Sequence, residues 1–439
     1  MLFYKLIDYL NDKGWFPYFI VTPLFYSIGN ASEELYFANL KARRDNKKLI
    51  VLSPFLFTEF LGYKFCNKGL FELESEYTIS KTHKFIEFVL RLLLTIFFIP
   101  TRGMAVVLRS KFQINLIEDY YFPRIGIRSL WMLPGVSDFE WTTSDKVLWK
   151  KEFSDPLRIF LGKKQKLLSL KKCKEFGIPE ESKFVCIHVR EGGFKNDFDR
   201  RPYRNADIFN YIPAIEELTA RGYWVIRLGD SSMKRLPKME KVIDYPFTPQ
   251  KSSYMDMFLI QECDFYIGMH SGVLDTAFMF QKRILMVNMY NWTLGYPLKS
   301  CDRGILKHIF SKKKGRFLSV EEILNGSWKL QNTEGMLDDN FEMLENTKDE
   351  IRSAVVEFLD DSGIVNDLQK KANLARVRNT YVLFESSDCP PGENIKDLPL
   401  LEKYRYASRV KAASGFLCQG FLHKNWEIND RKTLNEVRH

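Results

Sequence analysis

Three stretches of the sequence place polar residues at the end of an apolar run of the kind that forms a buried strand. They carry His188, Arg190 and Glu191 in the first stretch, Arg227, Gly229 and Asp230 in the second, and Gly268, His270, Ser271 and Gly272 in the third. Guanidinium groups match the geometry of phosphate oxygens, and backbone N–H groups at the start of a helix attract anions. Together the three stretches predict a site for an anionic ligand such as a phosphate.

Each stretch alone has a more ordinary explanation. An arginine at the end of a strand commonly forms a weak surface ion pair, and a glycine-containing loop between a strand and a helix is common. The sequence contains neither GxGxxG nor GxxxxGK[ST], which disfavours a dinucleotide-dependent dehydrogenase and a P-loop enzyme. The recurrence of polar residues after three apolar runs is what favours a ligand site.

The region 183–288 alternates between apolar runs and segments with helical periodicity. The predicted strands are 184–189, 223–228, 242–245, 264–267 and 284–288, and the predicted helices are 206–221, 252–262 and 273–281. Such alternation is typical of a Rossmann-like domain, a parallel sheet covered by helices on both faces. Ligands of such sheets bind beyond the carboxyl ends of the strands, so the three polar stretches should meet in one crevice.

A shorter alternation near the amino end predicts a second domain of the same kind. An apolar run at 18–26 leads through a loop into a helix, and a strand follows at 49–52. We expect Asn30 or Ser32 to cap this helix, and Gly29 to let the chain turn tightly out of the strand.

A length of 439 residues predicts more than one domain. We predict an amino-terminal Rossmann-like domain at 1–165, a second Rossmann-like domain at 166–345, and a helical extension at 346–439 that packs back on the first domain. A lysine-rich segment at 163–182 predicts an amphipathic, basic helix that ends at Gly177 and leads into the second domain. The predicted fold class is α/β.

The composition is basic, with a net charge of +10 and a pI near 9.0. Nucleotides, nucleic acid and acidic lipid headgroups are therefore candidate partners. The basic residues form only short clusters, such as those at 163–166 and 312–314, and the sequence contains no arginine-rich tract, so nucleic acid is disfavoured.

Seven cysteines, with no CxxC pair, predict a reducing compartment without a disulfide framework or a zinc site. The amino end lacks the pattern of a cleaved signal peptide. The apolar segment 85–100 is short for a membrane span and contains Glu87 and Arg91, so we interpret it as a buried or amphipathic helix in preference to a helix on a membrane surface.

Two of the motifs are similar to those of a known family. The His188-Val189-Arg190 motif on a strand, followed by Asp264-Phe265-Tyr266-Ile267-Gly268 and then Ser271-Gly272, resembles the carboxyl-terminal half of GT-B glycosyltransferases of the fucosyltransferase type (HxR motif). The wider pattern, with RPYRNADIFNY at 201–211 and VIRLGD at 225–230, resembles bacterial glycosyltransferases from surface-polysaccharide loci. The similarity extends over about 15–427 and is strongest at 183–290.

This resemblance implies two Rossmann-like domains that face a cleft, with a nucleotide-sugar donor on the second and an acceptor near Gly29 and Asn30 of the first. It implies that Arg190 pairs with the donor diphosphate and that Ser271 and Gly272 contact phosphate. Asp264 matches an aspartate near the nucleotide, although its place at the start of a strand also fits a structural role. The sequence departs from the family at Glu191, where the family has a basic or small residue followed by an aspartate, so a GDP-sugar is only weakly favoured.

The chemistry of sugar transfer fits these residue types. Breaking a sugar–diphosphate bond builds negative charge on the leaving phosphate, which arginines and helix amides can stabilise without a metal. No DxD motif follows a strand, and we interpret Asp338-Asp339 and Asp360-Asp361 as solvated faces. An inverting reaction needs a base, and Glu191 is the nearest candidate, with Asp197 and Asp199 further along the loop. We expect His188 to orient its neighbours, and His270 fits a ligand contact or a plain loop residue equally well.

The sequence thus predicts a metal-independent glycosyltransferase of hexosyl or deoxyhexosyl type that acts on a glycan or lipid-linked glycan acceptor in surface-polysaccharide synthesis. The predicted catalytic residues are Arg190, Glu191 and His188. The predicted donor-binding residues are Arg227, Gly229, Asp230, Asp264, Gly268, His270, Ser271 and Gly272. The expected location is cytoplasmic, with peripheral contact to an anionic membrane on its inner face. A non-catalytic nucleotide- or anion-binding protein and a basic membrane-surface scaffold are the alternatives.

Overall fold

The computed structural model describes residues 2–52, 65–78, 85–86, 88–93, 95–96, 107, 111–112, 125–126, 157–195, 202–290, 299–325, 340–385 and 415–427. The loop carboxylates Asp197 and Asp199, as well as Cys389, lie outside these residues. The six described cysteines are free thiols.

A seven-stranded parallel sheet forms the centre of the larger part of the protein. Its strands in spatial order are β14 (Phe416–Leu417), β10 (Arg303–Leu306), β9 (Arg283–Met289), β8 (Phe265–Gly268), β5 (Phe184–His188), β6 (Trp224–Arg227) and β7 (Val242–Asp244). Every neighbouring pair is parallel. The five predicted strands agree with the observed ones to within one residue at each end, while β10 and β14 were not predicted. The predicted α/β class is confirmed.

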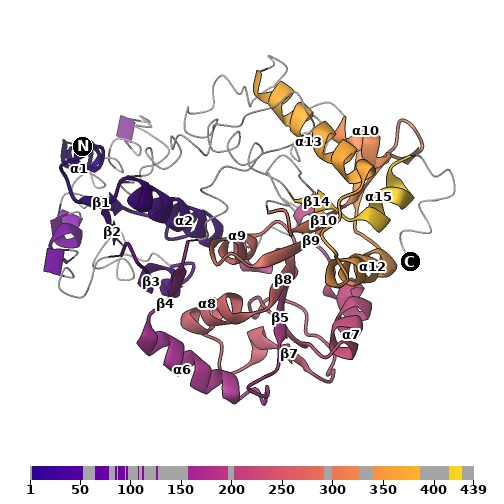
Figure 1. The fold of residues 1–439 in the computed structure, drawn as a ribbon, viewed down its shortest axis with the longest axis horizontal. Helices are drawn as coiled ribbons and strands as arrows, with labels where there is room; N and C mark the ends of the chain where they lie inside the picture. The colour runs from indigo at the N-terminus through magenta and orange to yellow at the C-terminus, as the bar shows by residue number, and fades with distance from the viewer. Residues whose placement is uncertain are drawn as a thin grey trace.

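Helices cover both faces of this sheet (Figure 1). α8 (Ser253–Glu262) and α9 (Gly272–Met279) lie on one face, and α7 (Ile212–Ala220) and α12 (Lys348–Leu359) lie on the other. All residues of β5 and β8 are buried as a result, which explains why these strands are continuous apolar runs.

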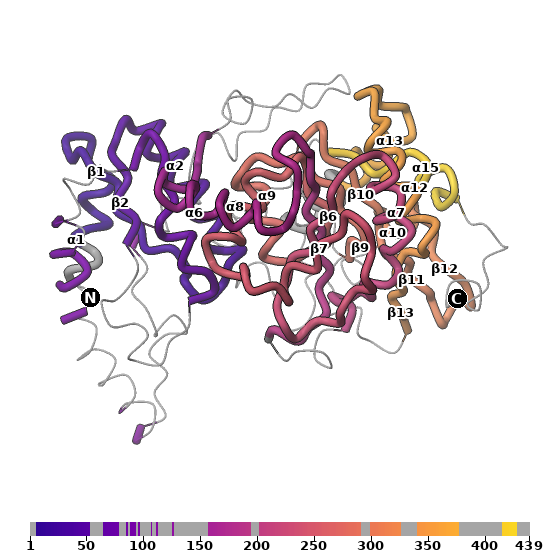
Figure 2. The backbone as a smooth tube through the Cα atoms, turned by 90° about the horizontal axis from the view of Figure 1, so that it is seen from below, coloured from indigo at the N-terminus to yellow at the C-terminus, as the bar shows by residue number. Residues whose placement is uncertain are grey.

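The amino-terminal part contains a β–α–β unit. α1 (Leu2–Asn11) precedes β1 (Tyr18–Val21), α2 (Ile28–Arg44) follows, and β2 (Lys48–Val51) pairs in parallel with β1. Figure 2 shows this indigo part at one end of the molecule and the yellow carboxyl-terminal elements at the other.

The start of α2 differs from the prediction. Ser27 is the N-cap, so the helix begins before both Asn30 and Ser32, and neither of them caps it. Gly29 lies inside the first turn of α2 and does not form the tight turn that we expected. A Cβ at this position would lie 2.8 Å from the Cα atom of Gly272, so the absence of a side chain allows α2 to approach α9 closely.

The contact between α2 and α9 joins the two parts of the protein. Ser32 Oγ and Thr276 Oγ1, both buried, share a hydrogen bond of 2.8 Å. One turn further along, the rings of Tyr36 and Phe278 meet edge to face with centroids 4.8 Å apart. The two helices therefore pack tightly from their amino ends onward (Figure 1).

A short strand pair connects the two parts at a second place. β3 (Leu73–Ser75), which follows the 3-10 helix η1 (Lys68–Glu72), pairs antiparallel with β4 (Ile159–Leu161). α6 (Lys163–Lys174) follows β4 and packs against α8. It begins where the basic helix was predicted and ends three residues earlier than predicted.

The carboxyl-terminal elements pack on the second domain, where we had predicted packing on the first. β14 extends the seven-stranded sheet beside β10, and α15 (Gln419–Asn425) packs on α12. α13 (Asp367–Glu385) packs against β14 and against α10 (Val320–Leu324). A three-stranded sheet of β12 (Arg316–Phe317), β11 (His308–Ser311) and β13 (Phe341–Leu344) completes this end. The buried edge of β10 requires a partner strand, which the extension supplies.

The segment 85–96 is helical at 85–86, 88–93 and 95–96, and its residues 87 and 94 lie outside the described part. Phe85, Phe88 and Ile96 are 74%, 50% and 54% exposed, so the described residues do not form a buried helix, and the alternative of an amphipathic helix stays a prediction. Within the described part of the chain, none of the helices combines the length and apolarity that a membrane span requires.

We predict that Gly29→Ala lowers the stability of the protein. The new methyl group would meet the backbone of Gly272, and overpacking of this kind costs about 1–3 kcal/mol in the free energy of unfolding. Gly14→Ala is the matched control, because a Cβ there meets nothing within 4 Å. Chemical denaturation of the three proteins measures the effect, and equal stabilities for the two variants would contradict the close contact between α2 and α9.

Candidate functional site

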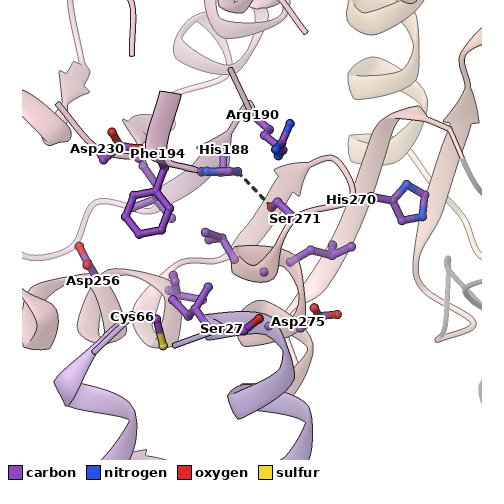
Figure 3. Close-up of a pocket in the computed structure, with 18 of the residues that line it drawn as sticks. Ser27, Cys66, His188, Arg190, Phe194, Asp230, Asp256, His270, Ser271 and Asp275 are labelled. Atoms are coloured by element: carbon purple, nitrogen blue, oxygen red, sulfur yellow. Dashed lines mark hydrogen bonds between the residues drawn. The ribbon is translucent and has the colours of Figure 1, made fainter. Parts of the chain in front are cut away.

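A cavity of about 540 Å³ lies where the amino end of α2 faces the carboxyl ends of the parallel strands. Ser27 to Asn30 line it from α2, and residues that follow β5, β6 and β8 line it from the sheet. Lys251 and Asp256, near the start of α8, contribute a third side. Figure 3 shows the labelled side chains of these three sides around one space.

The structure places most of the predicted site residues on this cavity. Those that line it are His188, Arg190, Glu191, Gly229, Asp230, His270, Ser271, Gly272, Gly29 and Asn30. Three predicted donor-binding residues, Arg227, Asp264 and Gly268, do not line it.

His188 is the last residue of β5 and is a buried, neutral imidazole. Its Nδ1 atom shares a hydrogen bond of 3.2 Å with Ser271 Oγ (Figure 3). Burial, together with the nearby charge of Arg227, lowers the pKa of His188 to about 3. A neutral imidazole can orient the Ser271 hydroxyl by hydrogen bonding, which is the behaviour that we expected of His188.

Arg190 follows β5 and is half-buried at the cavity wall. Its guanidinium Nη1 donates to Asn205 Oδ1, and its backbone N–H donates to Met269 Sδ over 3.3 Å. In addition, the N–H of Ala206 donates to the carbonyl of Arg190 over 3.0 Å. These contacts hold the guanidinium group in place above Ser271, as Figure 3 shows.

The amino ends of α2 and α9 both face the cavity. Their N-cap residues, Ser27 and Ser271, are extended, and neither forms a side-chain cap bond to its own helix. The first N–H groups of a helix have no acceptor within the helix and carry the positive end of its dipole. Asp275, in the first turn of α9, lies close to Gly29, so its carboxylate is near the amino ends of both helices. What distinguishes α9 is the arginine beside it. The amino end of α9, next to Arg190, is the stronger candidate for an anion.

Arg227 does not face the cavity, which corrects its prediction as a donor-binding residue. Its side chain is fully buried. Its guanidinium group donates to Asp244 Oδ1 over 2.8 Å, to Glu191 Oε1 over 3.2 Å and to the carbonyl of Lys234 over 3.0 Å. The buried charge is therefore compensated inside the protein, as burial of an ion requires.

Glu191 is engaged on both carboxylate oxygens, so the prediction of Glu191 as the base does not fit its surroundings. Oε1 accepts from Arg227, and Oε2 accepts from the backbone N–H of Lys234 over 2.8 Å. Burial raises the pKa of Glu191, and the bond from Lys234 and the charge of Arg227 oppose that rise. Glu191 thus connects the loop after β5 to the loop after β6.

Asp264 and Gly268 serve the fold. Asp264 precedes β8 at the amino edge of the sheet, far from the strand ends that line the cavity, and its carboxylate lies 3.9 Å from Lys183 Nζ. A Cβ at Gly268 would lie 2.6 Å from the hydroxyl of Tyr266, so glycine makes room for that buried ring.

The cavity also contains residues that the sequence analysis did not select: Phe194, Arg204, Lys251, Asp256 and Asp275. Asp256 Oδ1 pairs with Lys251, and its Oδ2 accepts from Asn67 Nδ2 over 3.1 Å. Burial raises the pKa of Asp256, and Lys251 opposes the rise. The RPYRNADIFNY segment was a signal for Arg204. Asp256 and Asp275 lie on the helices predicted at 252–262 and 273–281, but a lone carboxylate on a helix is not a motif. Phe194 and Lys251 lie in short or irregular segments that have no sequence signal.

Comparison with known proteins gives only distant structural likenesses. No protein-family model and no curated protein matches the sequence. A glycosyl transferase of family 9 from Veillonella parvula DSM 2008 aligns over 79% of this chain and 98% of its own, with 9% identity and a TM-score of 0.39. The ADP-heptose LPS heptosyltransferase II of E. coli aligns over 61% of this chain and 83% of its own, with 13% identity and a TM-score of 0.31.

A further likeness, to the dodecameric iron-containing heptosyltransferase TibC, extends over 25% of this chain and 28% of the other, with 16% identity and a TM-score of 0.18. All three of these proteins are glycosyltransferases by name. TM-scores of this size carry no argument about function, so the function of the cavity has to be argued from its own residues.

We predict that His188 makes the protein less stable in mild acid. The unfolded chain binds a proton at His188 near its ordinary pKa of 6.5, whereas the folded protein does so only near 3, so stability falls as the pH drops below 6.5. The expected loss at pH 5 is about 2 kcal/mol. Urea denaturation at pH 7.5 and pH 5 should show a smaller loss for His188→Asn, and an equal loss would contradict burial of a neutral imidazole.

We also predict that Arg227→Met destabilises the protein strongly, because it leaves Glu191 and Asp244 buried or half-buried without their cation. Breaking one side of a buried ion pair costs about 3–5 kcal/mol in the free energy of unfolding. Arg352→Met, which removes an exposed ion pair with Glu217, should cost less than about 1 kcal/mol. A mild effect of Arg227→Met would contradict the role of Arg227 as the buried counter-ion of Glu191 and Asp244.

Proposed function

We propose that the cavity binds a nucleotide sugar and that the protein is a glycosyltransferase. The observation that carries this proposal is the meeting of the Arg190 guanidinium group, the Ser271 hydroxyl and the amino end of α9 on one cavity wall. Each of these groups donates hydrogen bonds, and together they suit the oxygens of a diphosphate.

Other residues of the cavity favour a ligand that is larger than a phosphate and carries hydroxyl groups and an aromatic ring. Asp230, Asp256 and Asp275 present carboxylates, which accept hydrogen bonds from sugar hydroxyls. Phe194 lies on the 3-10 helix η3 (Gly193–Lys195) at the cavity and is 66% exposed, so a nucleobase could stack on its ring. A volume of about 540 Å³ is typical of sites for ligands of this size.

The reaction follows from this arrangement. As the bond between the sugar and the diphosphate breaks, negative charge develops on the leaving phosphate next to Arg190 and the amides of α9, and these groups stabilise the transition state. Transfer would need no metal for that purpose. Because Glu191 and Asp256 are each engaged on both carboxylate oxygens, a base for the acceptor hydroxyl would come from Asp230 or Asp275, which also line the cavity.

The acceptor would enter from the side of α2, where Gly29 and Asn30 line the cavity. We keep the proposal that it is a glycan or lipid-linked glycan of a surface polysaccharide, which rests on the resemblance of the sequence to that group. The donor stays open: the resemblance to fucosyltransferases favours a GDP-sugar, and the name of the E. coli neighbour contains ADP-heptose. Both nucleotides therefore belong in the test.

We predict that one nucleoside diphosphate raises the melting temperature of the protein and that Arg190→Ala removes this effect. GDP, ADP and UDP, together with CMP, are compared by thermal denaturation. A ligand at about 100 times its Kd stabilises the folded state by about 2.7 kcal/mol. Arg352→Ala is the matched control, because it removes the same charge from the exposed surface of α12.

The outcomes separate the alternatives. A shift that Arg190→Ala removes and Arg352→Ala retains supports the site, and release of the same nucleotide from its sugar donor in the presence of EDTA supports metal-independent transfer. A shift without turnover of any donor would favour a non-catalytic nucleotide-binding protein. No shift with any nucleotide would overturn the proposal.

A further inference from the structure

α6 has an outer face that no other described element covers. The helix packs on α8 through its inner side, where Ser169 is buried, Cys173 is half-buried and Lys166 pairs with Glu262 over 2.7 Å. On the outer side, Leu167 and Leu168 are 57% and 56% exposed. Figure 1 shows α6 at the edge of the molecule, outside α8.

Lysines stand at both ends of these leucines. Lys163 and Lys164 precede them and Lys171 and Lys172 follow, all four exposed, and the helix contains no acidic residue. Within the part of the chain that the structure describes, none of the four forms an ion pair. The outer face of α6 therefore combines an apolar centre with uncompensated positive charge at each end.

We propose that the outer face of α6 docks on the surface of an anionic lipid bilayer. Leucines at the centre of the helix can enter the boundary between headgroups and acyl chains, while lysines on long flexible stems reach the phosphates on either side. The net charge of +10 adds attraction to an anionic surface at longer range.

A second copy of this chain is a poorer occupant. Two α6 helices packed face to face would bring lysines against lysines, and like charges in contact repel. Three exposed leucines, including Leu170, also offer too little apolar area for a stable dimer, which needs about 1,200 Å² or more of buried surface. A bilayer needs no such area, because charge supplies much of the binding.

The exposed apolar side chains of 85–96 are a weaker candidate, because Arg91 is the one basic residue among the described residues there, whereas four exposed lysines accompany the leucines of α6. Docking by α6 also has a consequence for the cavity. α6 packs on α8, and Ser253, Asp256 and Ile260 of α8 line the cavity, so docking would hold the cavity close to the lipid surface. The proposal does not depend on the nucleotide-sugar proposal, because vesicle binding requires no donor.

The test is co-sedimentation of the full chain with vesicles, without nucleotide. The wild-type protein should bind vesicles of phosphatidylglycerol and phosphatidylcholine in equal parts, should not bind pure phosphatidylcholine, and should lose affinity as salt is added. Lys164→Glu combined with Lys171→Glu should lower the affinity by about tenfold or more.

Two further variants make the test specific for α6. Lys312→Glu combined with Lys313→Glu makes the same change of charge in the turn between β11 and β12, at the other end of the molecule, and should keep the affinity within about threefold (Figure 2). Leu167→Ser combined with Leu168→Ser leaves the charge unchanged and should lower the affinity by about tenfold. All three changes are at exposed side chains, and their melting temperatures should equal that of the wild type.

Three results would overturn the proposal. The first is wild-type protein that fails to bind the anionic vesicles or binds neutral ones equally well. The second is an equal loss of affinity in the control at 312 and 313, which would assign binding to the total charge of the protein. The third is a wild-type dimer in sedimentation without lipid that the leucine variant abolishes, because a second copy would then cover α6.

Discussion

The crossing of α2 and α9 at two glycines is the constraint on which the rest of the structure depends. Gly29 and Gly272 bring the backbones of two helices together at their amino ends, and a Cβ on either residue would meet backbone atoms of the other helix. The cavity exists because these two helix starts lie side by side and face the same strand ends. Hydrogen bonding between Ser32 and Thr276 then continues the contact away from the cavity. The contact between α2 and α9 therefore determines both how the two parts of the protein pack and where the cavity forms.

Buried charge gives the cavity its second support. Arg227 holds Glu191 and Asp244 in place, and Glu191 in turn accepts the N–H of Lys234. Two loops at the cavity rim are therefore fixed by one guanidinium group that does not itself line the cavity. Glu191, which differs from the residue expected from the fucosyltransferase resemblance, thus provides the counter-ion of a buried arginine. The same guanidinium charge contributes to keeping His188 neutral, which leaves the imidazole available to orient Ser271.

The sequence predicted the parallel strands of the second domain well, because strands buried on both faces are continuous apolar runs with clear ends. It also brought His188, Arg190 and Ser271 to one edge of the sheet, since topology alone places the carboxyl ends of parallel strands together. The prediction that Arg227 binds the donor was wrong, because the direction of its side chain depends on the pleat of β6 and on partners in two loops, and the local sequence shows neither. The role of Gly29 was also predicted wrongly, because the helix that Gly29 contacts, α9, lies more than two hundred residues further along the chain. β14 was missed because it has only two residues. Contacts that are distant in the sequence leave no local signal.

The role of a charged residue depends on its surroundings, which the sequence does not show. Arg303 is as basic as Arg190 in the sequence, yet it is buried and its Nη2 atom lies 2.7 Å from Asp361, so it holds the carboxyl-terminal extension to the sheet. Asp361 is thus largely covered, which corrects its interpretation as part of a solvated face. Arg190 is held from one side by Asn205 and keeps contact with the cavity. Lys164 and Lys171 have no partner in the described residues, and their charge remains on the surface. Three kinds of environment thus distinguish structural support, the proposed ligand contact and the proposed attraction to a lipid surface, and only the last of these is expected to depend strongly on salt.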